Sequence, residues 1–340
     1  MAVTASGRRP ERIEIEPSRP AVGEVRIDVA ACGVCYADLG AAGARTSSYG
    51  FPMTPGHEIA GTIAELGADV VGWSVGDRVA LGWFGGSCGH CGVCRRGDVV
   101  HCPERRIPGV SYPGGWAESV TAPARALVPI PDAMSFSEAA PFGCAGVTAF
   151  NAVRSAGLRP GSRVAVFGIG GLGHLAVQFA ARMGFETVAI ARGSQREALA
   201  RSLGAHHYLD SEVQSPGEAL AALGGADLIV YTASSTAPAG TLIDGLADGG
   251  HLVLVGVDGG TVQLPVGRLV MSGLTIRGHL TGGPADVERA MNFAVMNDVR
   301  PVLETRPLTE AAEALDDLRL GRTRFRTVLE MREGSEADPR

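Results

Sequence analysis

The chain opens with stretches in which apolar and polar residues alternate. The alternation is clear in IEIEP at 13–17 and in EVRIDVAA at 24–31. A repeat of two is typical of a strand that buries one face and exposes the other. Turn-forming residues separate such stretches over residues 1–145. The pattern therefore predicts a mostly β region there.

The pattern changes at about residue 150, where continuous apolar runs alternate with stretches of helical periodicity. The runs are RVAVFG, TVAIAR, ADLIVYTA, GHLVLVG and LTIRGH. Strands that are apolar throughout are typical of a parallel sheet covered on both faces. The alternation of strand and helix predicts a doubly wound α/β domain over residues 146–280. Beyond it we expect a helix around 285–297 and a strand at RTVLEM, 326–331.

A glycine-rich loop follows the first of these runs. Gly168, Gly170 and Gly173 have the G-x-G-x-x-G spacing, and Gly171 and Leu172 complete the loop. The motif alone is weak, and a glycine turn without a ligand is the alternative. The strand before it and the helical pattern after it favour a dinucleotide site, in which the pyrophosphate lies at the helix N-terminus.

The end of the second strand indicates which nicotinamide cofactor binds. A site for NAD usually has Asp or Glu there, to bind the ribose 2′-hydroxyl. Here the strand ends in Ala-Arg-Gly-Ser, so Arg192 and Ser194 replace the acid. A guanidinium pairs well with a 2′-phosphate, although Arg192 could also stack on adenine. We therefore expect NADP(H) to be preferred over NAD(H).

Four of the seven cysteines lie within fifteen residues, in CGHCGVCRRGDVVHC. Cys88, Cys91, Cys94 and Cys102 have the spacing of four thiolates around one structural zinc ion. Disulfides and unrelated thiols are the alternatives. A zinc ribbon for nucleic acid usually sits in a small basic domain, whereas this chain is long and acidic.

Three further candidate ligands are far apart in sequence. They are Cys35, His57 and Cys144, and together they would leave a fourth zinc position open for substrate, as in a catalytic site. Asp38 could accept the spare N–H of His57, and Glu58 could be a neighbouring carboxylate or a transient ligand. Spacing alone does not decide between this site and cysteines that are ordinary core residues.

Composition narrows the function further. The net charge of −6 gives no basis for binding nucleic acid or an anionic membrane. All 30 basic residues are arginines, so catalysis through a lysine Schiff base is excluded. No apolar run reaches about 18 residues and the N-terminus has no signal-peptide pattern, so we expect a cytoplasmic protein. Thiols stay reduced there, which favours metal binding over disulfides.

The order of these motifs resembles the zinc-dependent medium-chain alcohol dehydrogenases. Cys35, the GHE at 56–58, the four-cysteine loop, GCAGVT at 143–148 and the glycine loop occur in that order. The resemblance implies a GroES-like catalytic domain at 1–145 and 281–340, with a structural zinc lobe at 85–103, and a Rossmann domain at 146–280. It implies two zinc ions per chain, and it makes Cys35, His57 and Cys144 the catalytic ligands. Cys32 is then a buried thiol without a ligand role.

The resemblance also implies cofactor contacts. Thr148 packs against the nicotinamide, and Arg326 binds the pyrophosphate. The backbone near Val255, Val257 and His279 lines the nicotinamide. Relatives usually carry Ser or Thr two residues after the catalytic cysteine, and some keep a His further on. This chain has Ala37 and Gly40 instead, so the usual hydroxyl relay for the alcohol proton is absent.

The sequence thus predicts an NADP-preferring oxidoreductase that interconverts an alcohol with an aldehyde or ketone, with zinc polarising the substrate oxygen. A related reductase of activated C=C or C=N bonds is the alternative, and Ala37 leaves room for it. A non-catalytic protein that kept the fold is a third, weaker hypothesis. The expected partners are a small-molecule substrate and further copies of the chain, as a homodimer or homotetramer.

Overall fold

The computed structural model describes residues 1–44, 46, 48–235, 238–256 and 260–331. The chain forms two compact units. The first comprises Met1–Val147, Thr281–Met296 and the described residues from Pro301 onward, and the second comprises Thr148–Leu280 and Asn297–Arg300. The first unit is therefore built from separate stretches of the sequence.

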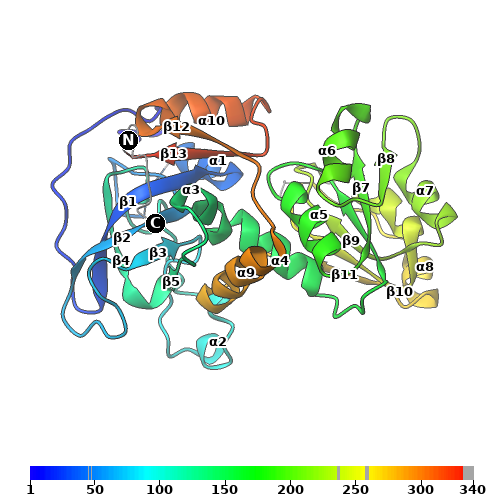
Figure 1. Ribbon diagram of the computed structural model, residues 1–340, viewed down its shortest axis with the longest axis horizontal. Helices are drawn as coiled ribbons and strands as arrows, with labels where there is room; N and C mark the ends of the chain where they lie inside the picture. Colours follow the sequence, from blue (N-terminus) through cyan, green and yellow to red (C-terminus); the bar gives the residue numbers. More distant parts are fainter. Residues whose placement is uncertain (45, 47, 236–237, 257–259, 332–340) are drawn as a thin grey trace. The chain divides into compact units, whose positions relative to one another are not determined.

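A seven-stranded sheet organises the first unit (Figure 1). Its strands are β1 (Glu24–Val34), β2 (Ile59–Leu66), β3 (Arg78–Leu81), β4 (Ser119–Pro123), β5 (Leu127–Pro129), β12 (Leu303–Pro307) and β13 (Arg326–Glu330). The order is β12-β13-β1-β2-β3-β5, and β4 also pairs with β1. All pairs are antiparallel except β12 with β13. Because β13 pairs with Ala31–Val34 of β1, the C-terminal segment completes the sheet that the N-terminal segment begins.

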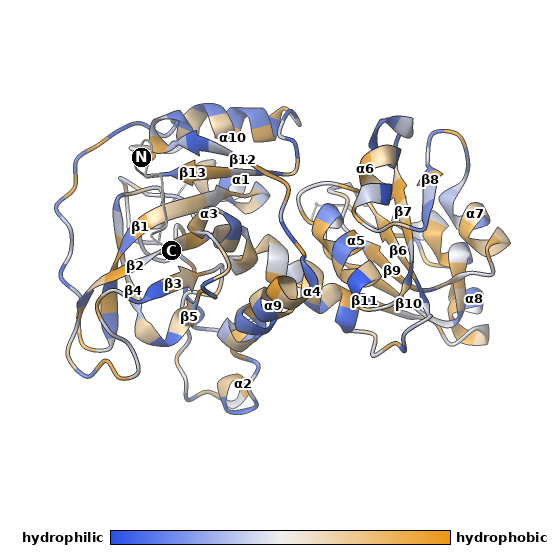
Figure 2. Cartoon of the chain, viewed as in Figure 1, coloured by the Kyte–Doolittle hydropathy of each residue, from blue (hydrophilic) through white to orange (hydrophobic). Residues whose placement is uncertain are grey.

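Short helices connect these strands. They are α1 (Tyr36–Ala42), α2 (Gly92–Arg95), α3 (Phe136–Ala139), α9 (Pro284–Asn297) and α10 (Ala311–Arg319), with the 3-10 turns η1 (Val99–His101), η2 (Ala124–Ala126), η3 (Ala140–Gly143) and η6 (Leu308–Glu310). The apolar side of α10 packs on the sheet through Ala311, Ala314 and Leu315, which belong to the same core cluster as Ile27 and Trp116. Figure 2 shows the polar residues of α10 on its other side.

The strand expected at 13–17 is wrong. Residues 12–21 are irregular, and Ile15 is 60% exposed. Alternation identifies a face that could be buried, but a strand also needs an edge on which to pair. Both sides of β1 are already taken by β2, β4 and β13. Pro17 and Pro20 also lack the N–H groups that a ladder requires.

A six-stranded parallel sheet organises the second unit. Its strands are β6 (Arg163–Phe167), β7 (Glu186–Ala191), β8 (His207–Asp210), β9 (Ala226–Tyr231), β10 (Leu246–Leu254) and β11 (Thr275–Gly278), in the order β11-β10-β9-β6-β7-β8. This is the Rossmann order, with the sequence reversing direction between β6 and β9. The predicted fold class, a Rossmann sheet domain with a mostly β partner, is confirmed. Only β8 was not anticipated, because HYLD is a short, half-buried edge strand.

Helices cover both faces of this sheet. They are α5 (Gly173–Arg182), α6 (Glu197–Ser202), α7 (Pro216–Ala222) and α8 (Val266–Met271), with η4 (Ser194–Arg196) and η5 (Ala239–Gly245), while α4 (Ala145–Arg154) crosses the boundary between the units. Figure 1 shows α5 and α6 on one side of the strands and α7 and α8 on the other. Apolar residues fill β6, β7 and β9, as Figure 2 shows. Within the described residues, no helix has the length and apolar character needed to span a bilayer.

Candidate functional site

The four clustered cysteines have the geometry of a tetrahedral metal site. The Sγ atoms of Cys88 and Cys94 lie 3.9 Å apart, those of Cys91 and Cys102 4.0 Å, and those of Cys88 and Cys102 3.6 Å. Four sulfurs at about 2.3 Å from one zinc ion would lie about 3.8 Å from one another. All seven cysteines are free thiols. The donor set therefore fits a zinc ion without rearrangement.

Local backbone structure presents these sulfurs. Cys91 caps α2, and its Sγ accepts a hydrogen bond from the Cys94 N–H; the Cys88 Sγ accepts one from the Cys91 N–H at 3.4 Å. Gly89 and Gly97 have φ values of 78° and 85°. Residues with a side chain rarely adopt these values, so these turns need glycine. His90 and His101, which lie in the same loop, are exposed.

A second donor cluster forms in the first unit from three distant segments. Cys35 caps α1, His57 lies two residues before β2, and Cys144 lies between η3 and α4. The two sulfurs are 3.9 Å apart, and the ligand atoms of Cys35, His57, Glu58 and Cys144 all lie within 4.8 Å of one another. The His57 Nε2 atom is buried and has no hydrogen-bond partner in the described part of the chain. A buried nitrogen without a hydrogen-bond partner, beside two thiols, is the arrangement expected of metal ligands.

Asp38 orients this cluster. Its Oδ1 lies 2.9 Å from Nδ1 of His57 and accepts the Gly56 N–H at 3.3 Å, while its Oδ2 accepts the Cys35 N–H at 2.9 Å. Asp38 is only 1% exposed. When Nδ1 carries the proton and donates it to Asp38, the lone pair of Nε2 is directed at the thiols. One carboxylate thereby fixes both the ring of His57 and the backbone of Cys35.

The pKa shifts of Cys35 and His57 favour the binding of a cation. Hydrogen bonding from Cys144 lowers the pKa of Cys35 well below its usual value, against the effect of burial, and His57 lowers it further. Burial would lower the pKa of His57, but the charge of Asp38 raises it well above its usual value. A metal ion would replace the proton on His57 and bind a thiolate that already forms readily.

Glu58 forms a buried ion pair beside the cluster. Its Oε2 is in short contact with Nη2 of Arg326, and the two side chains are 0% and 4% exposed. Burial raises the pKa of Glu58 to about 7, although Arg326 opposes this shift. The other oxygen, Oε1, has no hydrogen-bond partner among the described residues. The predicted contact of Arg326 with a pyrophosphate stays a prediction, since its visible partner is Glu58.

The glycine loop of the second unit has the shape that its motif requires. Gly168 has φ 95°, and a Cβ on Gly173 would lie 1.8 Å from the Gly168 carbonyl oxygen. Only glycine allows that approach of α5 to β6. A Cβ on Gly170 would meet nothing within 4 Å, so the space in front of Gly170 is open. Gly171 and Leu172 connect it to α5, and their cofactor roles stay predictions. The loop thus provides an open surface at the N-terminus of α5.

The loop after β7 lies against the glycine loop. Arg196 donates a hydrogen bond to the Ile169 carbonyl at 3.0 Å. Arg192 and Ser194 are both exposed at the end of β7. Two residues that sequence analysis missed hold this loop: Asp210 accepts the Gly193 N–H at 2.8 Å, and Tyr208 donates to the Gly193 carbonyl at 2.5 Å. Both belong to β8, the strand whose weak apolar pattern gave no signal.

The other predicted cofactor residues are distributed along the same edge of the sheet. Val255 follows β10 and His279 follows β11, and these strands are parallel neighbours. The carboxyl ends of β6, β7, β10 and β11 therefore meet at one edge, which is where dinucleotides bind in such sheets. Thr148 is buried at the start of the second unit. Val257 lies outside the described residues. The cofactor roles of these residues stay predictions.

Sequence analysis also missed Gly33. A Cβ at this position of β1 would lie 2.0 Å from Oε2 of Glu58, so the glycine makes room for the buried carboxylate. An isolated glycine inside a strand is the only signal in the sequence, and it does not say what approaches. Cys32, in contrast, is fully buried as predicted.

Comparison with known proteins agrees with this geometry. Residues 21–132 match the model of the alcohol dehydrogenase GroES-like domain, and residues 171–296 match the model of the zinc-binding dehydrogenase family. Together these matches cover more than half of the chain. The first lies within the first unit, and the second covers most of the second unit and continues to Met296 of the first.

Individual relatives extend over nearly the whole chain. Alcohol dehydrogenase notN of Aspergillus sp. (strain MF297-2) is 40% identical, over 95% of this chain and 95% of that protein. Aldehyde reductase AdhA of Synechocystis sp. is 34% identical, over 96% and 97%. The crystal structure of CAD from Helicobacter pylori complexed with NADP(H) superposes with a TM-score of 0.86 at 25% identity, covering 97% of this chain and 96% of that one.

Members of this family bind zinc and a nicotinamide cofactor, and the donor clusters and the glycine loop described above fit both groups. The chain belongs to the zinc-dependent medium-chain dehydrogenase/reductase family of oxidoreductases.

Proposed function

We propose that the protein is an NADP(H)-preferring alcohol dehydrogenase or aldehyde reductase. In this proposal it transfers a hydride between the nicotinamide and the carbon of a small alcohol, aldehyde or ketone. The observation that carries the proposal is the buried cluster of Cys35, His57 and Cys144, with an unpaired Nε2 atom beside two thiols. Relatives named alcohol dehydrogenase and aldehyde reductase support it.

The residues of the cluster have distinct roles in this proposal. Cys35, His57 and Cys144 hold a zinc ion, and a bound zinc ion supplies Lewis acidity that polarises a substrate oxygen. Asp38 keeps His57 in the tautomer that presents Nε2. Glu58 sits beside the thiols, where it offsets the charge of Arg326. A second zinc ion, held by the four-cysteine loop, is structural.

The preference for NADP(H) is supported by the loop after β7. Arg192 and Ser194 are exposed there, and Arg196 is anchored to the glycine loop. The nearby carboxylate of Asp210 is occupied by the N–H groups of Gly193 and Glu212. The positive charge of Arg192 therefore remains available for a 2′-phosphate.

The absence of a hydroxyl at Ala37 argues against vigorous oxidation of simple alcohols and favours aldehyde reduction or a specialised substrate, and it leaves room for the alternative reductase of activated C=C or C=N bonds. Tyr36 and Tyr49 are poor substitutes in a relay. The Tyr49 hydroxyl donates to the Thr54 carbonyl and accepts the Thr54 N–H, and its pKa is raised to about 12 by burial. Tyr36 is 60% exposed. A solvent-mediated proton path is the alternative to a relay through these two tyrosines.

Oxidation of NADPH and NADH with a panel of aldehydes, ketones and enones tests the proposal. We expect aldehyde turnover, and a higher kcat/KM with NADPH. Cys35→Ser should abolish turnover and remove one zinc ion per chain, while Cys32→Ser is the matched control, because Cys32 is an equally buried thiol outside the cluster. Turnover of enones alone would replace the proposal with the alternative. Full activity of Cys35→Ser would reject the metal assignment.

We further propose that the chain forms a homodimer or homotetramer in the cytoplasm. The edge strand β11 and the exposed side chains of Val266, Val270 and Met271 on α8 offer an apolar face to a second copy. Seven free thiols suit a reducing compartment. Light scattering of the purified protein distinguishes monomer, dimer and tetramer. We assign the catalytic role to the first unit and cofactor binding to the second.

A further inference from the structure

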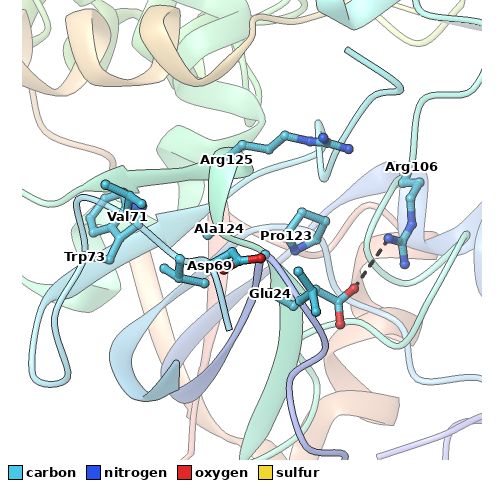
Figure 3. Close-up of a pocket in the computed structure, with 11 residues that line it drawn as sticks. Glu24, Asp69, Val71, Trp73, Arg106, Pro123, Ala124 and Arg125 are labelled. Atoms are coloured by element: carbon cyan, nitrogen blue, oxygen red, sulfur yellow. Dashed lines mark ion pairs between the residues drawn. The ribbon is translucent and has the colours of Figure 1, made fainter. Parts of the chain in front are cut away.

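A pocket of about 430 Å³ lies in the first unit where the four-cysteine loop joins the sheet (Figure 3). Two of its lining side chains are arginines, Arg106 and Arg125. Each arginine is connected to one end of the loop. These two arginines of the pocket wall therefore also contact the four-cysteine loop.

Arg106 stands where the chain leaves the loop. Its N–H donates to the Gly86 carbonyl and its carbonyl accepts the Gly85 N–H, both at 2.8 Å, so the two ends of the loop are paired. The guanidinium lies 4.6 Å from the Tyr112 ring centroid and forms an ion pair with Glu24 of β1 at 3.6 Å. Figure 3 shows Arg106 directed at Glu24. This end of the loop is anchored to β1.

Arg125 reaches the other end, where the chain enters the loop. It is the central residue of η2, and the flanking Ala124 and Ala126 are buried, so its backbone is fixed while its side chain extends. Its Nη2 donates to the carbonyl of Ser87, the residue before the first clustered cysteine. A Cβ on Gly89 would lie 4.0 Å from its Nη1.

Ser87 connects this contact to a metal ligand. The residue is 6% exposed and directly precedes Cys88, the first of the clustered cysteines. The Cys88 Sγ in turn accepts the Cys91 N–H at 3.4 Å. By holding the Ser87 carbonyl, Arg125 therefore fixes the backbone from which Cys88 enters the cluster.

The positive charge of Arg125 bears on the stability of the zinc site. Four thiolates around one Zn²⁺ ion carry a net charge of −2, and the whole protein is also negative. A guanidinium close to such a centre lowers the free energy of holding that charge away from water. Hydrogen bonds to charged groups are also stronger than neutral ones.

We propose that Arg125 is a positioning residue of the four-cysteine zinc site. It fixes the backbone of Ser87, and with it the position of Cys88, and its charge stabilises the thiolate centre. Loss of Arg125 therefore speeds zinc release from the loop without altering the ligands. The inference rests on the proposed structural zinc ion.

Zinc release to a chromogenic chelator tests the inference in the full-length Cys35→Ser protein, where the remaining zinc belongs to the loop. We expect Arg125→Gln to release zinc at least about tenfold faster, a factor of ten being about 1.4 kcal/mol. Arg125→Lys, which keeps the charge and one donor, should be intermediate. Arg8→Gln is the matched control, because Arg8 is an exposed arginine far from the loop in sequence.

Three further measurements separate positioning from general destabilisation. Ser87→Ala keeps the carbonyl that Arg125 holds, so this variant should release zinc within about twofold of the native rate. The thiolate-to-cobalt absorption of the Co²⁺-substituted loop should change in Arg125→Gln. The urea midpoint of unfolding should change too little to explain the release rate.

Release from Arg125→Gln within about twofold of that from Arg8→Gln would overturn the inference, as would a rate that follows global unfolding. These results differ from failure of the zinc assignment itself. If the Cys35→Ser protein contains no zinc, the structural site is absent. If it contains one zinc ion per chain and Arg125→Gln has no effect, only the role of Arg125 is wrong.

Discussion

Replacing Arg326 by methionine is expected to destabilise the protein by about 3–5 kcal/mol, because it leaves a buried carboxylate without its partner. Arg326 is 3% exposed, and Nη2 contacts Oε2 of Glu58, which is 0% exposed. The backbone of Gly33 packs directly against that oxygen. Water therefore has no space to replace the lost donor, and the full desolvation cost of Glu58 appears in the free energy of unfolding.

The size of the loss should depend on pH. The pKa of Glu58 is raised by burial from 4.5 to about 7 in the native state. A group with a raised native pKa contributes stability below its unfolded pKa and loses that contribution as pH rises through the native value. Burial lowers the pKa of Arg326, but Glu58 and Cys35 raise it more, so Arg326 stays charged throughout. Without Arg326 the pKa of Glu58 rises further, and the loss is larger at about pH 8 than at about pH 5.

Urea unfolding at both pH values measures the effect. The double variant Glu58→Gln/Arg326→Met should recover part of the stability, since it removes both charges. Arg9→Met is the control: Arg9 pairs with Asp316 at 2.8 Å, but it is 59% exposed, and such pairs contribute less than about 1 kcal/mol. A loss below about 1 kcal/mol for Arg326→Met, or no pH dependence, would refute the reasoning. Titration of the same variants with NADPH tests the predicted pyrophosphate contact separately.

Three further predictions concern the second unit. Gly173→Ala should lower the free energy of unfolding by at least about 2–3 kcal/mol, because its Cβ would lie 1.8 Å from a carbonyl oxygen. The Cβ of Gly170→Ala would meet nothing within 4 Å, so this variant should keep the melting temperature of the native protein and bind NADPH more weakly in calorimetry. Arg192→Gln should raise the KM for NADPH at least about tenfold and leave the KM for NADH nearly unchanged; equal effects on both cofactors would contradict the 2′-phosphate contact. The pKa of Glu186 is lowered by its hydrogen bond to Arg163, against burial, so its contribution to stability is present above the unfolded pKa of 4.5 and is lost as pH falls through the native value. Melting curves of Glu186→Gln and the native protein should accordingly differ at neutral pH and converge in acid.

Much of the fold follows from local pattern. The five apolar runs became β6, β7, β9, β10 and β11. In β6, β7 and β9 the reason is burial on both faces, which requires apolar residues nearly throughout, whereas β11 is a mostly exposed edge strand. The alternation in EVRIDVAA became β1 for the equivalent one-sided reason. The same alternation failed at 13–17, because alternation shows which face could be buried but does not provide a partner strand, and Pro17 lacks the N–H that a ladder requires.

The candidate sites divide in the same way. The four-cysteine loop is encoded locally, because its ligands are within fifteen residues and short turns suffice to converge the sulfurs. The glycine loop is also local, because the strand before its motif and the helical pattern after it are adjacent in sequence.

Tertiary structure decided the contacts between distant segments. Cys35 and Cys144 are 109 residues apart, and Glu58 and Arg326 are 268 apart, so no periodicity relates them. Only the pairing of β13 with β1 brings Arg326 to Glu58, and only the caps of α1 and the turn before β2 bring His57 to the thiols. Spacing constrains residues that share a turn of chain, whereas a site assembled across a sheet depends on strand order, which is set by the packing of the whole core.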